Sequence, residues 1–147
     1  IKAEEDPRIN KMAIWASVSD FKARFKENTP EFSLWKEKGV TYVENSRTKQ
    51  MLPQRFQLYK NFKENEERLT IKRAVMNLKI PLLIVHGSDD PTVSLNEAQT
   101  IHLWNPQSNL EIIDKADHVF NAKHPWEEAT LPNQLKTAVE RTIEFFK

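Results

Sequence analysis

Apolar residues along this chain gather in three short runs of the kind that form buried strands. Residues 9–16, 82–85 and 110–113 are rich in Ile, Leu, Val, Met and Ala, and polar or turn-forming residues flank each run. Short continuous apolar runs are typical of strands covered on both faces, as in a parallel sheet. We therefore expect three parallel strands at these positions.

Helix signals follow the second and third of these runs. Ser94 and Glu97 have the spacing of a capping box, which predicts a helix from there to about Trp104. A long polar and aromatic loop over 114–130 then leads to Pro132, which opens a final amphipathic helix. Strands that alternate with helices through right-handed connections form a parallel sheet flanked by helices. The predicted fold class is therefore α/β, with a partial parallel sheet of about three strands.

The segment between the first and second strands has a different character. We expect a β-hairpin in which residues 40–43 and 48–52 are joined by a polar turn at 44–47. Short helices are expected around it, after Ser19 or Asp20, from Pro30 to Gly39, after Pro53 and from Thr70. We assign 20–79 to an α+β cap insertion, and 1–19 together with 80–147 to the core. The aromatic side chains of the insertion are expected to pack in its interior or to line an apolar pocket.

Composition is that of a globular protein and excludes several kinds of chemistry. Apolar residues make up 39% and charged residues 29%, and 22 basic residues against 21 acidic ones give a net charge of +1. This balance predicts neither a nucleic-acid partner nor an anionic membrane surface. The absence of cysteine excludes disulfides, thiolate catalysis and zinc–thiolate sites. No apolar run approaches the roughly 18 residues of a membrane span.

The cellular compartment stays open. No signal-peptide pattern is visible, which favours the cytoplasm. The chain begins at Ile1, however, and its first methionine is Met12. We therefore expect the native start to lie outside this sequence.

Two residues with acid–base chemistry follow neighbouring strands of the predicted sheet. Asp90 comes shortly after the run 82–85, and His118 follows the run 110–113. Because the carboxyl ends of parallel strands meet at one edge of a sheet, we expect these side chains to lie together. Asp90 would accept a hydrogen bond from one nitrogen of His118 and fix its tautomer, and His118 would shuttle a proton.

Other residues of this region offer alternative assignments. Asp89 is the rival acid, and either aspartate could serve as a turn residue. His86, at the end of its strand, is expected to be a packed and hydrogen-bonded histidine rather than a second base. A metal site formed by His86, Asp90 and His118 is chemically possible, but the spacing matches no compact metal motif. We therefore expect no metal site, and no cofactor is implied.

A nucleophile for this pair is missing from the sequence. Gly39 and Gly87 are the only glycines, so a G-x-S-x-G turn occurs nowhere in the chain. Ser17 and Ser19 lie after the first strand, but neither is flanked by glycine. We expect them to be cap or turn residues.

Together these motifs resemble the end of the α/β-hydrolase fold. A strand leading to His86-Gly87-x-x-Asp90 precedes a strand and loop with Asp117-His118-x-Phe120, and a final amphipathic helix follows. The resemblance is greatest to dienelactone-hydrolase and prolyl-oligopeptidase-like esterases, and its motifs cover residues 80–147. Residues 9–19 resemble the strand after the nucleophile helix of that family, and 20–79 resemble an inserted cap. The resemblance implies that Asp90 is the triad acid and His118 the base, in the order Ser, Asp, His.

The resemblance implies a truncated α/β-hydrolase fold and the C-terminal fragment of a serine hydrolase. The longer protein would hydrolyse a small-molecule carboxylic ester, lactone, thioester or small amide, while this chain alone would be inactive because it lacks the nucleophile. The first strand would then have an unpaired edge, which predicts self-association of the fragment. The alternative is a non-catalytic binding or interaction module on a relic hydrolase fold. The coding sequence upstream of Ile1 distinguishes the two.

Overall fold

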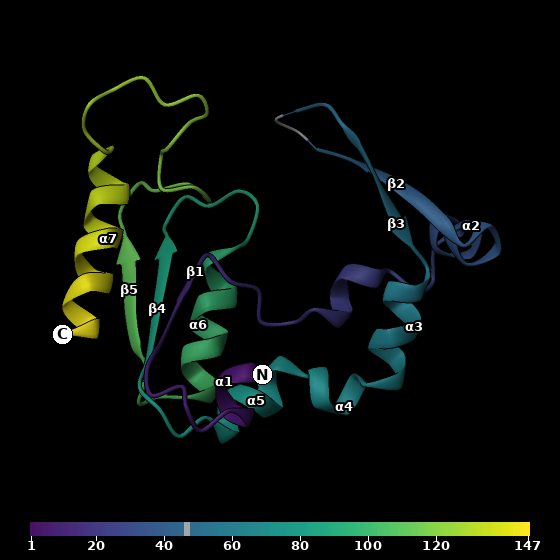
Figure 1. The fold of residues 1–147 in the computed structure, drawn as a ribbon, viewed down its shortest axis with the longest axis horizontal. Coiled ribbons are helices and arrows are strands. Elements are labelled where there is room, and N and C mark those ends of the chain that lie inside the picture. The colour runs from purple at the N-terminus through teal and green to yellow at the C-terminus, as the bar shows by residue number, and fades with distance from the viewer. Residues whose placement is uncertain (46–47) are drawn as a thin grey trace. The chain divides into compact units, whose positions relative to one another are not determined.

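The three apolar runs form one parallel sheet in the computed structural model, which describes residues 1–45 and 48–147. The strands are β1 (Met12–Trp15), β4 (Leu82–Gly87) and β5 (Asn109–Ile113), in the order β1-β4-β5 (Figure 1). Every residue of β4 is buried, as expected for a central strand covered on both faces. The predicted α/β class, with a three-stranded parallel sheet flanked by helices, is confirmed.

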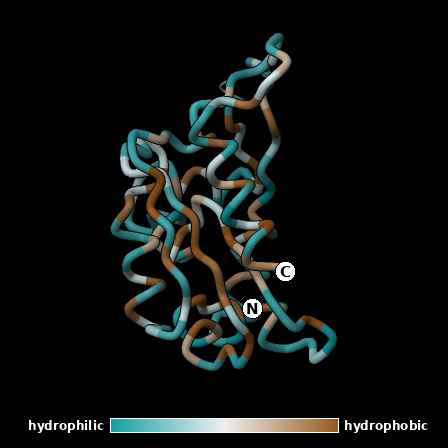
Figure 2. Tube along the Cα trace, turned by 90° about the vertical axis from the view of Figure 1, so that its left-hand side faces the viewer, coloured by the Kyte–Doolittle hydropathy of each residue, from teal (hydrophilic) through white to brown (hydrophobic). Residues whose placement is uncertain are grey.

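Alternate residues of β4 belong to two separate apolar clusters, one on each face of the sheet. Leu82 and Ile84 pack with residues of α1 (Lys2–Glu5), α5 (Ile71–Asn77) and α6 (Leu95–Trp104). Leu83 and Val85 pack with Ala138 of α7 (Asn133–Phe146) and with the loop after β5. Figure 2 shows the hydrophobic stretches of the chain concentrated in the strands, with mostly hydrophilic loops between them. The period of two along a strand therefore accounts for the helix layers on both faces.

The outer edge of β1 has no neighbouring strand among the described residues. The N–H groups of Met12 and Ala16 donate to the carbonyls of Pro81 and Val85, at 3.0 and 2.9 Å. Successive N–H groups of a strand point to opposite sides, so the N–H of Ala13, next to Met12, faces the open edge.

The chain divides into two compact units whose boundaries differ slightly from those predicted. One unit comprises Ile1–Ser19 and Ile71–Lys147, and the other comprises Asp20–Thr70. The predicted insertion ends at residue 79, whereas the second unit ends at Thr70. The difference arises because α5 belongs to the first unit, where Val75 packs in the apolar cluster that contains Leu82.

The second unit has a core of aromatic side chains. Its elements are η1 (Lys22–Phe25), α2 (Pro30–Lys38), β2 (Val40–Glu44), β3 (Met51–Arg55), α3 (Gln57–Glu64) and α4 (Glu66–Leu69). The strands β2 and β3 form the expected antiparallel hairpin. Phe25, Trp35, Phe56 and Phe62 form its buried apolar core, with Phe32 and Tyr59 against them.

One element of this unit differs from the sequence prediction. Pro53 does not open a helix but lies in β3 opposite Tyr42, and the helix begins at Gln57. A two-stranded hairpin has only edge strands, in which proline is tolerated because its missing N–H can face outward. The predicted second strand, 48–52, therefore lies instead at Met51–Arg55. Part of the predicted turn, residues 46 and 47, lies outside the described residues.

Candidate active site

The candidate acid lies in a tight turn directly after β4. One carboxylate oxygen of Asp90, Oδ1, accepts hydrogen bonds from the backbone N–H groups of Thr92 and Val93, both at 2.8 Å. Aspartate favours such turns because its short side chain reaches the backbone N–H groups two and three residues further on. The side chain of Asp90 is completely buried. Its two backbone donors therefore hold Oδ1 on the side of the turn.

Hydrogen bonds keep this buried carboxylate ionised. Burial by itself raises the pKa of Asp90. The backbone N–H of Val93, the ring of His118 and the backbone N–H of Thr92 act in the opposite direction, and the resulting pKa lies below the ordinary 3.8. Asp90 is thus an anion at neutral pH.

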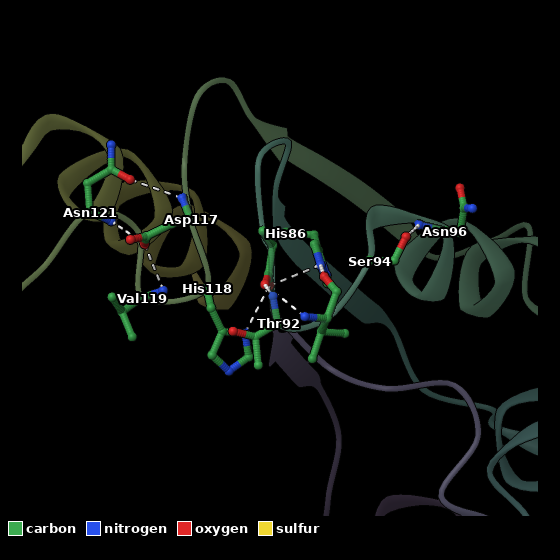
Figure 3. Close-up of polar contacts among 10 residues, drawn as sticks. His86, Thr92, Ser94, Asn96, Asp117, His118, Val119 and Asn121 are labelled. Carbon is green, nitrogen blue, oxygen red and sulfur yellow. Dashed lines mark hydrogen bonds and ion pairs between the residues drawn. The ribbon is translucent and has the colours of Figure 1, made fainter. Parts of the chain in front are cut away.

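The candidate base reaches this carboxylate from the loop after β5. Nδ1 of His118 lies 2.8 Å from Oδ2 of Asp90 (Figure 3). Because an ionised carboxylate only accepts hydrogen bonds, Nδ1 carries the proton of this bond, and Nε2 of the neutral ring keeps a lone pair. The side chain of His118 is 37% exposed. The structure thus brings together the two residues that the sequence placed at the ends of neighbouring strands.

Polar side chains on either side of His118 close its loop. Oδ1 of Asp117 accepts hydrogen bonds from the N–H groups of Val119 and Asn121, at 2.9 and 2.8 Å. In return, the side-chain oxygen of Asn121 accepts from the N–H of Asp117 at 2.9 Å (Figure 3). Its amide nitrogen donates to the carbonyl of Lys115 at 3.0 Å. Sequence reasoning missed Asn121. The available signal was the pair Asp117 and Asn121, two residues of the turn-forming Asx type that lie four positions apart on either side of His118.

Backbone contacts hold the loop after β4, which carries Asp90 (the acid loop), against the loop after β5, which carries His118 (the base loop). The N–H groups of Ser88 and Asp89 donate to the carbonyls of Ile113 and Ala116, each at 3.0 Å. A Cβ atom on Gly87 would lie only 2.2 Å from the carbonyl oxygen of Ala116. Glycine is therefore required at this position for the two loops to approach one another.

The rival acid has a different environment. Asp89 is exposed, and its Oδ1 accepts a hydrogen bond from the hydroxyl of Ser88 at 2.8 Å. His86 is completely buried, with Nε2 2.8 Å from the carbonyl of Val93 and 3.4 Å from Oδ2 of Asp90. Asp90 is thus the carboxylate that contacts both histidines.

The two serines considered as nucleophiles have local partners. Ser19 donates from both its N–H and its hydroxyl to the carboxylate of Glu97. Ser17 makes a long contact of 3.4 Å with the carbonyl of Val18. Ser94 caps α6 as expected, accepting from the N–H of Asn96 at 3.3 Å (Figure 3). Neither Ser17 nor Ser19 is bonded to His118.

The described part of the chain contains neither a metal-ion cluster nor a membrane-spanning helix. Across residues 1–45 and 48–147, no group of three or more His, Asp or Glu side chains is arranged to hold a metal ion. No helix in that part of the chain is long and apolar enough to cross a membrane.

Known structures share the fold at low sequence identity. No protein-family model and no curated protein sequence matches this chain. The structure is similar to that of Est1E from Butyrivibrio proteoclasticus, with a TM-score of 0.59 and 13% identity over 98% of this chain and 52% of that one. An esterase domain from a Rhodothermus marinus protein has a TM-score of 0.52 and 17% identity over 81% and 47%. A bromoperoxidase from Bacillus anthracis has a TM-score of 0.51 and 18% identity over 95% and 58%.

The present chain spans about half the length of these structures. At these identities the likeness concerns the fold rather than the activity. Taken with the parallel sheet and its flanking helices, it shows that this chain has an α/β-hydrolase-like fold.

Proposed function

We propose that this chain supplies the acid and the base of a serine hydrolase. The observation that carries the proposal is the 2.8 Å contact between Nδ1 of His118 and Oδ2 of Asp90. The carboxylate is buried and held by two backbone donors, whereas the imidazole is partly exposed. A carboxylate fixed behind a solvent-accessible imidazole is the arrangement that general-base catalysis requires.

In this proposal, His118 performs the proton transfers. Its Nε2 takes the proton of a serine hydroxyl as that oxygen attacks the acyl carbon, and then gives the proton to the leaving group. Asp90 holds Nδ1–H and stabilises the imidazolium that forms between the two steps. The serine and the oxyanion donors come from polypeptide outside these 147 residues, because no G-x-S-x-G occurs within them.

We also propose a family, a substrate class and a cap for this enzyme. The strand–His86-Gly87-x-x-Asp90 motif supports a relationship to dienelactone-hydrolase and prolyl-oligopeptidase-like esterases. The substrate would be a small-molecule carboxylic ester, lactone, thioester or small amide. The unit Asp20–Thr70, with its aromatic core, would be the cap of such an enzyme.

The acid–base pair can be tested on this chain by proton NMR. A hydrogen bond from Nδ1–H to a buried carboxylate gives a far-downfield proton resonance. We expect this resonance in the unmodified chain and its loss in Asp90→Asn and His118→Ala. Asp89→Asn is the matched control, since it removes a neighbouring exposed carboxylate and should leave the resonance in place. A folded chain without the resonance would overturn the proposed pair.

The catalytic role requires the longer polypeptide. We expect the coding sequence upstream of Ile1 to contain a strand followed by G-x-S-x-G, and the full-length protein to hydrolyse p-nitrophenyl acetate. Asp90→Asn should lower kcat by about 10⁴-fold because the histidine then adopts the wrong tautomer. Asp89→Asn should keep most of the activity, and the isolated 147-residue chain should show no turnover that depends on His118.

Two results would reject the enzyme. Activity of the full-length protein that survives His118→Ala would show that another base is used. A different residue at the serine position of the elbow would favour the alternative, a non-catalytic binding module on a relic fold.

A further inference from the structure

His86 is a buried ionisable residue that the proposed mechanism does not use. It lies in β4 with no exposed surface. Nε2 is 2.8 Å from the carbonyl oxygen of Val93. Since a carbonyl oxygen only accepts hydrogen bonds, Nε2 carries a proton and donates a hydrogen bond to this oxygen.

The other nitrogen of this ring, Nδ1, has no hydrogen-bond partner within residues 1–45 and 48–147. Nδ1 of His86 is buried and makes no hydrogen bond with any described residue. A proton on Nδ1 would therefore be an unsatisfied donor in the interior, which is costly. The environment accordingly selects the Nε2–H tautomer of His86, the opposite of the Nδ1–H tautomer that Asp90 selects in His118.

The same Nε2–H also faces the carboxylate of the candidate acid. It lies 3.4 Å from Oδ2 of Asp90, the oxygen that accepts the bond from His118 at 2.8 Å. The other oxygen, Oδ1, is held by the N–H groups of Thr92 and Val93. Both oxygens of Asp90 are thus surrounded by donors, and the donor from His86 approaches from the interior.

We propose that His86 is a positioning residue for the Asp90–His118 pair. Its single N–H bridges the Val93 carbonyl and the Oδ2 atom of Asp90, which fixes both ends of the turn that carries the acid. The carboxylate then cannot rotate about its Cβ–Cγ bond, and Oδ2 stays in line with Nδ1–H of His118. The catalytic consequence of this role rests on the proposed function, whereas its structural consequence does not.

Nitrogen-15 NMR of the unmodified chain provides the first test. Long-range proton–nitrogen spectra distinguish the two neutral tautomers of each histidine. We expect Nε2–H for His86 and Nδ1–H for His118 at a pH where both rings are neutral. An Nδ1–H form of His86 would overturn the proposal, because Nε2 could not then donate to Val93 or to Asp90.

Two substitutions of His86 then separate positioning from simple packing. His86→Leu removes the donor, and His86→Gln keeps an N–H close to the position of Nε2. We expect the downfield Nδ1–H proton of His118 to exchange with water at least about tenfold faster in the Leu variant, and the Gln variant to restore most of its protection. His102→Gln is the control, because His102 is a partly buried histidine of α6 whose Nδ1 lies 2.9 Å from the hydroxyl of Ser108.

The same variants in the full-length protein measure the catalytic consequence. We expect His86→Leu to lower kcat with little change in KM, and His86→Gln to recover most of kcat. A folded Leu variant with unchanged exchange at His118 would overturn the positioning role. If the Leu variant does not fold, the tautomer of His86 and the exchange in the Gln variant decide the matter. A full-length protein without activity, but with the expected tautomers and exchange, would reject the proposed function and retain the role of His86.

Discussion

Alanine at Gly87 should separate the acid loop from the base loop. Gly87 is the last residue of β4, where its backbone passes the loop that carries His118. A Cβ atom there would lie 2.2 Å from the carbonyl oxygen of Ala116, 2.7 Å from its carbonyl carbon and 2.8 Å from the carbonyl oxygen of Asp117. All three are backbone atoms, so no flexible side chain can move aside.

The displacement follows from these distances. Ordinary contacts begin at 3.4 Å, so the base loop must retreat from β4 by about 1 Å. A shift of that size would stretch the 2.8 Å bond between Asp90 and His118 beyond hydrogen-bonding range. Overpacking costs about 1–3 kcal/mol, and each hydrogen bond lost between the loops adds about 1 kcal/mol. With the bond between Asp90 and His118 lost, we expect a total loss of about 2–4 kcal/mol in the free energy of unfolding.

The only other glycine supplies a matched control. Gly39 ends α2 in the second unit with φ of +73°, and nothing lies within 4 Å of a Cβ built on it. Gly39→Ala should therefore cost about 1–2 kcal/mol through its left-handed backbone alone. It should leave the Asp90–His118 pair undisturbed.

Urea unfolding and proton NMR together test this reasoning. Gly87→Ala should lower the free energy of unfolding and abolish the downfield resonance of His118, whereas Gly39→Ala should lower stability and keep the resonance. A Gly87→Ala chain that loses less than about 1 kcal/mol and keeps the resonance would refute the argument. Such a result would mean that the loops can make room for the added methyl group while the hydrogen bond between Asp90 and His118 stays intact.

Three further predictions concern other parts of the chain. The hydrogen bond from Arg8 lowers the pKa of Asp6 from 3.8 to about 2. This pair therefore stabilises the fold above pH 3.8, and its contribution disappears as the pH falls toward 2. In acid unfolding, Arg8→Ala should show a smaller decrease in stability over that range than the unmodified chain. Trp35→Phe should destabilise the second unit by about 1 kcal/mol in urea unfolding, because the indole N–H bond to the carbonyl of Gln54, at 2.8 Å, is lost. We expect the chain to self-associate along the open edge of β1, and Ala13→Pro, which removes an outward N–H, should shift light-scattering mass toward the monomer; an unmodified chain that is monomeric at high concentration would contradict this.

The sheet and the contact between Asp90 and His118 were predictable because each depends on a strong local signal combined with a general rule. Three apolar runs gave the strands, and the rule that parallel strands place their carboxyl ends at one edge brought Asp90 and His118 together. Neither step required knowledge of how the side chains pack. The choice of Asp90 over Asp89 came from the family motif, and the 2.8 Å contact with His118 agrees with it.

Features that depend on tertiary pairing were not predictable in the same way. Proline is favoured both at the first turn of a helix and in an edge strand, and only the pairing of β3 with β2 decides between them for Pro53. The helix Ile71–Asn77 was itself expected, but its assignment to the core depends on the packing of Val75. Asn121 was missed because its role depends on a loop with left-handed backbone at Phe120 and Asn121, which no periodic pattern reports.

The contacts that place the acid beside the base all lie within β4, β5 and the two loops that follow them. The N–H groups of Ser88 and Asp89 bind the base loop, the missing side chain of Gly87 allows that approach, and His86 reaches the acid turn from inside the sheet. None of these contacts involves a serine nucleophile. The pair should therefore assemble as soon as the parallel sheet forms, with Nε2 of His118 ready to accept a proton. In the proposed function, the serine would therefore meet an imidazole that Asp90 has already oriented.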